Sequence, residues 1–454
     1  MKMFKTCGKT VLASLLAVSL AACSSAEQSQ PVPSAKDPGE KITVNFWHSM
    51  GGKAGSALDE LVKDYNASQN KYVVKAGFQG KYEDTLLKFR NTKASPDAPA
   101  VVQVNEISTQ AVIDTKKIVP IHTFVERDQF DTSKLEKNVT NYYHIDGKLY
   151  SMPFNSSTPL LYYNKDLFAK AGLDPQHPPR TFNEVREAAK KLTIREGNEV
   201  KQYGMNVRFE SWFFEQLMAT QGGFLIDQEN GRKGTPTKAS IASKEGEAIL
   251  KWIDDLNKDG SYVNYGANGD DIDSAFQSQK LAMYLNSSGA LGTLLDKTKG
   301  KFELGVAYLP HPDGVEPQGV VIGGGSLWMT NLVDDSVKEG VWDFMKYLTK
   351  ADVQAKWHLN TGYFPINVDA YKEESVKTAH EKTPVIQITV NQLHDTKMNT
   401  ATQGALTTAL PEIRKGIVKA MEQTIIGAAD YKTALAQAQV AADRAIEIAN
   451  RTAK

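Results

Sequence analysis

The sequence predicts an α/β protein of two lobes that are joined by a hinge and separated by a cleft. Predicted strands and helices alternate along the chain, in the order strand, helix, strand, helix, strand over residues 42–104. Three short segments look like crossings between lobes, because each is rich in Gly, Pro or small polar residues (152–158, 311–319 and 361–366). A chain of 454 residues is also too long for a single hydrophobic core.

The stretch Met152–Pro175 is the most informative of these crossings. It opens with the small polar residues Asn155–Thr158, which form turns and offer hydroxyl and amide groups. Leu160–Tyr163 then has the apolar, aromatic composition of a buried strand. Asn164 is a predicted N-cap for a helix over 165–171. A simple strand-to-helix joint with a polar turn explains the same pattern equally well.

The rest of the chain supplies elements for both lobes. The first lobe is predicted to contain strands at 42–47, 72–78 and 100–104, with helices at 57–67 and 82–89. The second has a capping box at Thr181 and Glu184, and a strand at 281–285 that ends in Asn286-Ser287-Ser288-Gly289. A glycine-broken strand spans 320–329, and the last 90 or so residues are mostly helical. We place lobe 1 at 42–156 and 318–362, and lobe 2 at 157–317 and 363–454.

The N-terminus is predicted to be a lipoprotein signal peptide over residues 1–22. Three lysines precede an apolar run, Val11–Leu20, which is too short to span a bilayer. Leu-Ala-Ala-Cys follows, as in the lipobox, so Cys23 is the expected lipidated first residue of the mature chain and 23–41 a flexible tether. An ordinary secretory signal is the alternative. Since Cys7 lies in the discarded part, no disulfide is expected. The protein is expected in the cell envelope, outside the cytoplasmic membrane.

Charge and motifs exclude several other classes of function. Lys plus Arg equals Asp plus Glu, so nothing indicates a nucleic-acid partner. The eight histidines are scattered, and the EF-hand-like run 255–260 has Gly266 where a bidentate acid is needed, so no metal is expected. Gly323-Gly324-Gly325-Ser326 matches neither a nucleophile elbow nor a P-loop. It is typical of a strand that something approaches closely. We expect no cofactor and no catalytic residues.

Several local sequences resemble one family. PFNSSTPLLYYNKDLFAKAGLDP at the first crossing, FWHSM at 46–50 and LPEIR at 410–414 are similar to segments of bacterial extracellular solute-binding proteins, and most closely to members that bind sn-glycerol 3-phosphate. The resemblance runs from about residue 42 to the C-terminal helices. It implies the type II, maltose-binding-protein-like form of the periplasmic-binding-protein fold.

The resemblance also implies a set of ligand contacts. Glu106 would accept hydrogen bonds from glycerol hydroxyls, Trp212 would form an aromatic wall, and Arg414 would hold the phosphate. The full set of implied ligand-binding residues is Tyr82, Glu106, Ser157, Trp212, Ser287, Gly324, Tyr363 and Arg414. Phe209 departs from the family, since a second wall tryptophan is expected there and phenylalanine lacks the indole N–H.

The function implied is capture of a small phosphorylated polyol and its delivery to the membrane permease of an ATP-driven (ABC) importer. The predicted partners are therefore this ligand, the permease subunits and, through the N-terminal lipid, a membrane. Two alternatives stay open. In the first, a protein of the same fold binds glycerophosphocholine or a neutral oligosaccharide instead. In the second, the protein is an envelope-bound hydrolase that uses Glu106 as one of two carboxylates.

Overall fold

The structure, a computed structural model, describes residues 41–452 of the chain. The predicted signal peptide, the lipid anchor at Cys23 and nearly all of the tether lie outside the described residues. Within 41–452, no helix combines the length and the apolar character that a membrane span requires.

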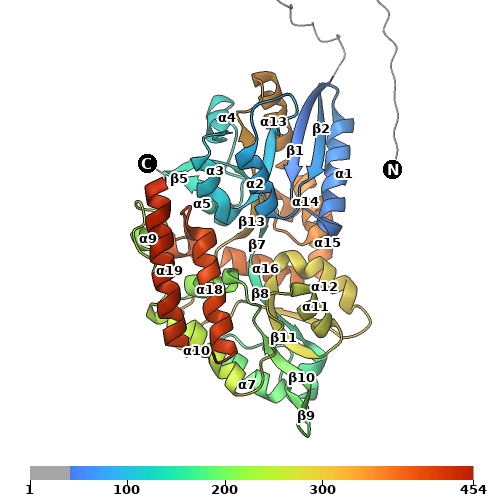
Figure 1. The fold of residues 1–454 in the computed structure, drawn as a ribbon. Helices are drawn as coiled ribbons and strands as arrows, with labels where there is room; N and C mark the ends of the chain where they lie inside the picture. The colour runs from blue at the N-terminus through green and yellow to red at the C-terminus, as the bar shows by residue number, and fades with distance from the viewer. Residues whose placement is uncertain (1–40, 453–454) are drawn as a thin grey trace, which may run out of the picture. The chain divides into compact units, whose positions relative to one another are not determined.

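A first sheet of six strands has the order β2-β1-β3-β13-β4, and β7 also pairs with β13 (Figure 1). β1 runs parallel to β2 and β3, whereas β13 runs antiparallel to β3, β4 and β7. The strands are β1 (Ile42–His48), β2 (Tyr72–Phe78), β3 (Val101–Asn105), β4 (Ile118–Val119), β7 (Met152–Ser157) and β13 (Gly323–Thr330). β13, far along the chain from its neighbours, thus occupies the interior of this sheet.

A second sheet of five strands has the order β12-β8-β11-β10-β9. Its strands are β8 (Pro159–Asn164), β9 (Ile194–Glu196), β10 (Glu199–Asn206), β11 (Leu281–Ser287) and β12 (Leu304–Ala307). The short hairpin of β5 (His144–Ile145) and β6 (Lys148–Leu149) forms a separate pair. Since β7 belongs to the first sheet and β8 to the second, the chain crosses between them at Thr158. Both strands are buried along their whole length.

Helices cover both sheets. Their bounds are α1 (Gly52–Ser68), α2 (Tyr82–Asn91), η1 (Glu106–Ser108), α3 (Thr109–Asp114), α4 (His122–Arg127), α5 (Lys137–Tyr143), α6 (Lys165–Lys170), α7 (Phe182–Leu192), α8 (Ser211–Thr220), α9 (Asp227–Gly231), α10 (Lys244–Lys258), α11 (Gly269–Gln277), η2 (Ser288–Ala290), α12 (Leu291–Thr298), α13 (Asp335–Leu348), α14 (Ala351–Thr361), η3 (Val368–Lys372), α15 (Glu374–Lys382), α16 (Val385–His394), α17 (Thr400–Gln403), α18 (Leu410–Ile425) and α19 (Tyr431–Thr452).

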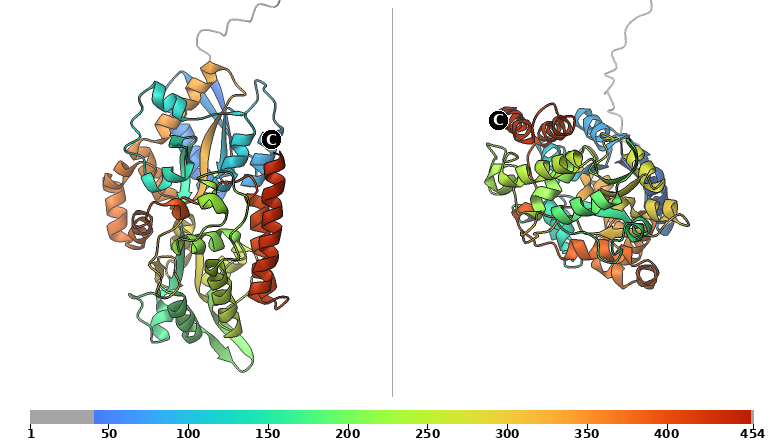
Figure 2. Two further views of the ribbon diagram at one scale, coloured as in Figure 1. Left: turned by 90° about the vertical axis from the view of Figure 1, so that its left-hand side faces the viewer. Right: turned by 90° about the horizontal axis from the view of Figure 1, so that it is seen from below.

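Each sheet has its own apolar core. α1, α13 and α14 bury the first sheet, and Trp357 of α14 stacks on Phe154 of β7 with ring centroids 4.6 Å apart. α7, α8, α10, α18 and α19 pack into the core of the second sheet. Figure 2 shows α18 and α19, the two red C-terminal helices, running side by side. We call the first sheet with its helices the first lobe, and the second sheet with its helices the second lobe.

Local sequence signals explain several element ends. Thr181 and Glu184 form the predicted capping box of α7. Asn164 accepts a hydrogen bond from the Leu167 N–H at 3.0 Å and so caps α6.

The strand predicted at 320–329 begins only at residue 323, because side chains accept the hydrogen bonds of the preceding backbone N–H groups. The Thr396 hydroxyl accepts from Val320 N–H at 3.2 Å, and Gln216 accepts from Val321 N–H at 2.8 Å.

The segment after α14 lies where the two lobes meet. Gly362, in the left-handed region with φ 86°, ends the helix, and Phe364 N–H donates to Ser156 of β7 at 2.9 Å. η3 and α15 then pack on α14. α16 packs on β12 of the second sheet, and its Val390 and Leu393 also join the core of the first. α16 thus contacts both lobes. The residue limits of the two lobes stay a prediction.

Candidate functional site

An arginine between two carboxylates joins the two lobes. Glu106 begins η1 at the end of β3, whereas Arg414 lies on α18 and Glu215 on α8. Arg414 Nη2 donates to Glu215 Oε2 at 2.7 Å and lies 3.5 Å from Glu106 Oε1. Arg414 Nε lies 2.5 Å from Glu215 Oε1, at an angle unsuited to a hydrogen bond. The three side chains expose 18%, 10% and 7% of their surface for Arg414, Glu215 and Glu106.

Burial sets the electrostatics of this cluster. It raises the pKa of Glu106 to about 7, although the positive charge of Arg414 opposes the rise. Burial alone would lower the pKa of Arg414, but the charges of Glu215 and Glu106 outweigh it and leave the pKa above its ordinary value. Arg414 therefore stays charged, while Glu106 changes its charge close to neutral pH.

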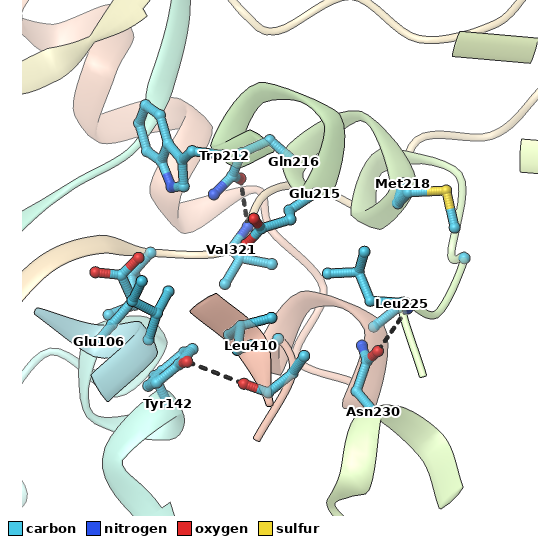
Figure 3. Close-up of a pocket in the computed structure, with 16 residues that line it drawn as sticks. Glu106, Tyr142, Trp212, Glu215, Gln216, Met218, Leu225, Asn230, Val321 and Leu410 are labelled. Atoms are coloured by element: carbon cyan, nitrogen blue, oxygen red, sulfur yellow. Dashed lines mark hydrogen bonds between the residues drawn. The ribbon is translucent and has the colours of Figure 1, made fainter. Parts of the chain in front are cut away.

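Next to this cluster is a small cavity of roughly 10 Å³, with room for about one water molecule (Figure 3). Glu106, Trp212, Glu215 and Gln216 line it. Gln216 uses its carbonyl oxygen for the backbone of Val321, and its amide nitrogen has no partner among the described residues. The buried indole N–H of Trp212 also lacks a partner there. The cavity thus presents two unused donors and two carboxyl groups.

A second group of polar residues surrounds Asn155 of β7. Its Nδ2 donates to the Tyr82 hydroxyl at 2.6 Å, and its Oδ1 accepts from Gln103 at 2.7 Å. Burial raises the pKa of Tyr82 and of Tyr363, and a contact with the Asn155 amide partly opposes the rise for both. Both phenols therefore remain protonated and can donate a hydrogen bond.

The second lobe contributes Ser287 and Gly289 to this group. The Ser287 hydroxyl accepts from Gly289 N–H at 3.1 Å, so it caps η2 while its own hydrogen remains available. The ring of Tyr363 lies against Gly289, where an added Cβ would come within 2.9 Å of it. A side chain at 289 would displace the tyrosine ring.

Three glycines of β13 connect the two groups. The Trp212 ring covers Gly323, which pairs with Ser157 of β7. Gly324 has φ +102°, and a Cβ there would lie 1.8 Å from the Asn155 carbonyl oxygen. Tyr82 and Asn155 lie against Gly325. The absence of side chains is thus what lets the polar groups of both lobes approach β13.

The structure brings the eight sequence-predicted residues into one region around these glycines. Their role in ligand binding remains a prediction. Sequence reasoning missed three residues, of which Asn155 was noted only as part of a polar turn, and Glu215 and Gln216 were not singled out. The detectable signal was the composition of SWFFEQLMAT, in which a buried apolar helix carries adjacent Glu and Gln. Buried polar residues of this kind need partners.

The pKa of Glu106 leads to a testable dependence of stability on pH. Because the folded-state pKa, about 7, lies above the ordinary 4.5, the stability from this group is complete below about pH 4.5 and is lost as pH rises through 7. Glu106→Gln cannot ionise. We expect the free energy of unfolding of this variant to exceed that of the parent by up to about 3 kcal/mol at about pH 8, and by little at about pH 4.

Thermal midpoints of both proteins, measured across this pH range, check the prediction. Glu83→Gln on α2 is the matched control, since Glu83 is exposed and carries the same charge. Parallel curves for the parent and Glu106→Gln would show that Glu106 is not the titrating group.

The chain belongs to the bacterial extracellular solute-binding protein family, whose model matches residues 60–384. A similar curated relative is the sn-glycerol-3-phosphate-binding periplasmic protein UgpB of Yersinia pseudotuberculosis. It is 32% identical over 399 residues, which cover 86% of this chain and 89% of the relative. The family predicted from the crossing segment is thereby confirmed.

Solved structures confirm the predicted fold class. UgpB from Mycobacterium tuberculosis in complex with glycerophosphocholine superposes with a TM-score of 0.76 at 21% identity, covering 90% of this chain and 99% of that one. The maltose/maltodextrin-binding domain MalE from Bdellovibrio bacteriovorus, bound to maltotriose, gives 0.72 at 17% identity, covering 89% and 100%. This chain therefore has the two-lobe, maltose-binding-protein-like fold.

Proposed function

We propose that the protein is the substrate-binding component of an ABC importer and captures sn-glycerol 3-phosphate or a related glycerophosphodiester between its lobes. The observation that carries the proposal is the partly buried Arg414, which lies on the second lobe and faces Glu106 of the first. A guanidinium suits a phosphate, and a carboxylate suits vicinal hydroxyls. The names of the curated relatives support the same ligand class.

In this proposal each lobe supplies part of the cage. Tyr82 and Glu106 of the first lobe hold the glycerol hydroxyls, and Arg414 with the Gly324 N–H holds the phosphate. Ser157, Ser287, Tyr363 and the Trp212 wall complete the enclosure. Hinge closure would exclude water and so strengthen the hydrogen bonds to the phosphate. The permease subunits would recognise the closed form, and the ligand would be released unchanged.

The proposal includes attachment to a membrane through a lipid on Cys23. Its support is the Leu-Ala-Ala-Cys sequence after an apolar run. With the chain anchored outside the cytoplasmic membrane, in the periplasm or at the cell surface, the tether would keep the binding lobes near the permease.

Calorimetric titration of the lipid-free chain from Gln28 onward tests the ligand. Glycerol 3-phosphate, glycerophosphocholine, maltose and glycerol are titrated side by side. We expect the phosphorylated ligands to bind and maltose and glycerol not to, because Arg414 is without a partner of matching charge in a neutral ligand. Recovery of intact ligand afterwards separates a binding protein from a hydrolase.

A result in which maltose alone binds would keep the fold and reject the phosphate site. The oligosaccharide alternative has one supporting observation, since MalE with maltotriose shares this fold. Binding of the diester alone would keep the transport role and the phosphate site, and would indicate a pocket shaped by Phe209 for a larger headgroup.

A further inference from the structure

We propose that Glu215 is a specificity-determining residue, which makes the site select a singly charged phosphate group over a doubly charged one. The inference rests on the proposed function, because it concerns the charge of the ligand that Arg414 binds. It assigns a role to a residue on α8 that lies beside the cage residues predicted from sequence.

The geometry commits one edge of the Arg414 guanidinium to Glu215. The two carboxylate oxygens face Nε and Nη2 at 2.5 and 2.7 Å. The Ser211 hydroxyl donates to Glu215 Oε1 at 2.9 Å and fixes the carboxylate from the same helix. The Nη1 edge makes no hydrogen bond to the described residues and remains for a ligand oxygen. Glu215 thus orients the guanidinium, and its negative charge offsets much of the positive charge of Arg414.

The surrounding groups do not restore a positive balance. Glu106 and Glu210 add further negative charge near Arg414, and Glu210 is already paired with Arg208. Arg232 is nearby but commits its guanidinium to the carbonyl oxygens of Gly404, Tyr142 and Gln403 at 2.8, 2.9 and 3.1 Å. The remaining titratable neighbours of Glu106 are the phenols of Tyr82, Tyr142 and Tyr143, which burial keeps protonated by raising the pKa of each. One cation therefore faces Glu215 and, at a pH where Glu106 is ionised, a second carboxylate.

This balance has a consequence for the ligand. A phosphate monoester loses its second proton near pH 6 and is a dianion at higher pH, whereas a diester keeps a single charge. A dianion brings one more negative charge toward Glu215 and Glu106, at a place where water screens little. The site should therefore accept the diester, or the protonated monoester, more readily than the dianion.

The test compares the parent with Glu215→Gln, which keeps the shape of the side chain and removes its charge. Glycerol 3-phosphate and glycerophosphocholine are titrated at about pH 8 and about pH 5.5, at constant ionic strength. In the variant at the higher pH, we expect the ratio of the two dissociation constants to shift about tenfold or more toward the monoester. At the lower pH, where the monoester is largely a monoanion, the shift should be less than about threefold.

Glu412→Gln is the matched control, because Glu412 is an exposed residue of the same charge two positions from Arg414 on α18. A ratio that does not move in Glu215→Gln at the higher pH would overturn the inference, whatever happens to the individual affinities. If Glu215 had only a structural role, the substitution would weaken the binding of both ligands to a similar extent.

A second measurement needs no variant. In the parent, the preference for the diester should grow from about pH 5.5 to about pH 8, and a constant or falling preference would overturn the inference even if Glu215→Gln does not fold. The proposed function fails in a different way, with neither phosphorylated ligand binding to the parent at either pH.

Discussion

Arg414→Ala is expected to weaken binding of phosphorylated ligands by about 2–5 kcal/mol, the largest loss of any single substitution in the site. The variant loses the charged donor for the phosphate. It also leaves Glu106 and Glu215 buried without their counter-charge, which should lower the free energy of unfolding by about 3–5 kcal/mol. Calorimetric titration and urea-induced unfolding measure the two effects separately.

Arg444→Ala is the matched control for Arg414→Ala. Arg444 lies on α19 and is exposed, and its replacement by alanine changes the net charge by the same amount. It should leave both ligand affinity and stability within about 0.5 kcal/mol of the parent. If Arg414→Ala binds the phosphorylated ligands as tightly as the parent, Arg414 does not hold the phosphate.

Gly324→Ala is expected to lower the free energy of unfolding by about 2–4 kcal/mol and to weaken ligand binding strongly. The new Cβ would lie 1.8 Å from the Asn155 carbonyl oxygen, and φ +102° is unfavourable for any residue with a side chain. Relief of the clash would push β7 away from β13. Asn155 would then carry Tyr82 and Ser157 out of position, because all three depend on this strand pairing.

Gly314→Ala provides the comparison for Gly324→Ala. Gly314 also has positive φ, +71°, but nothing lies within 4 Å of the position a Cβ would take. Gly314→Ala therefore measures only the cost of a positive φ in a residue with a side chain, about 1 kcal/mol of unfolding free energy. Equal unfolding midpoints in urea for the two variants would mean that the contact with Asn155 has no energetic importance.

Much of the fold was predictable from the sequence because local signals and tertiary contacts agree. The apolar run at 160–163 is the buried β8, and the polar residues before it form the end of β7 and the crossing at Thr158. The capping signals at Asn164 and Thr181 also act locally, so neighbouring residues suffice to predict them. The position of β13 between β3 and β4 was not predictable, because strand order depends on contacts distant in sequence.

The candidate site shows the same division. Arg414 and Glu106 could be predicted as site residues because each belongs to a recognisable local sequence. Glu215 was missed because its importance arises only when α8 packs against α18 and brings it to Arg414. Asn155 was named only within a polar turn, and its central place follows from the pairing of β7 with the glycines of β13. Spatial partners of this kind leave no pattern in a single sequence.

The place of β13 also bears on when the protein can fold. β3 ends at Asn105 and β13 begins at Gly323, so the first sheet lacks an interior strand until more than two hundred further residues are available. Contacts this distant in sequence slow folding. An exported chain benefits from the delay, because a polypeptide that stays unfolded during synthesis remains able to pass through a translocation channel. The strand that forms the floor of the candidate site would then also postpone assembly of the first lobe until the chain is outside.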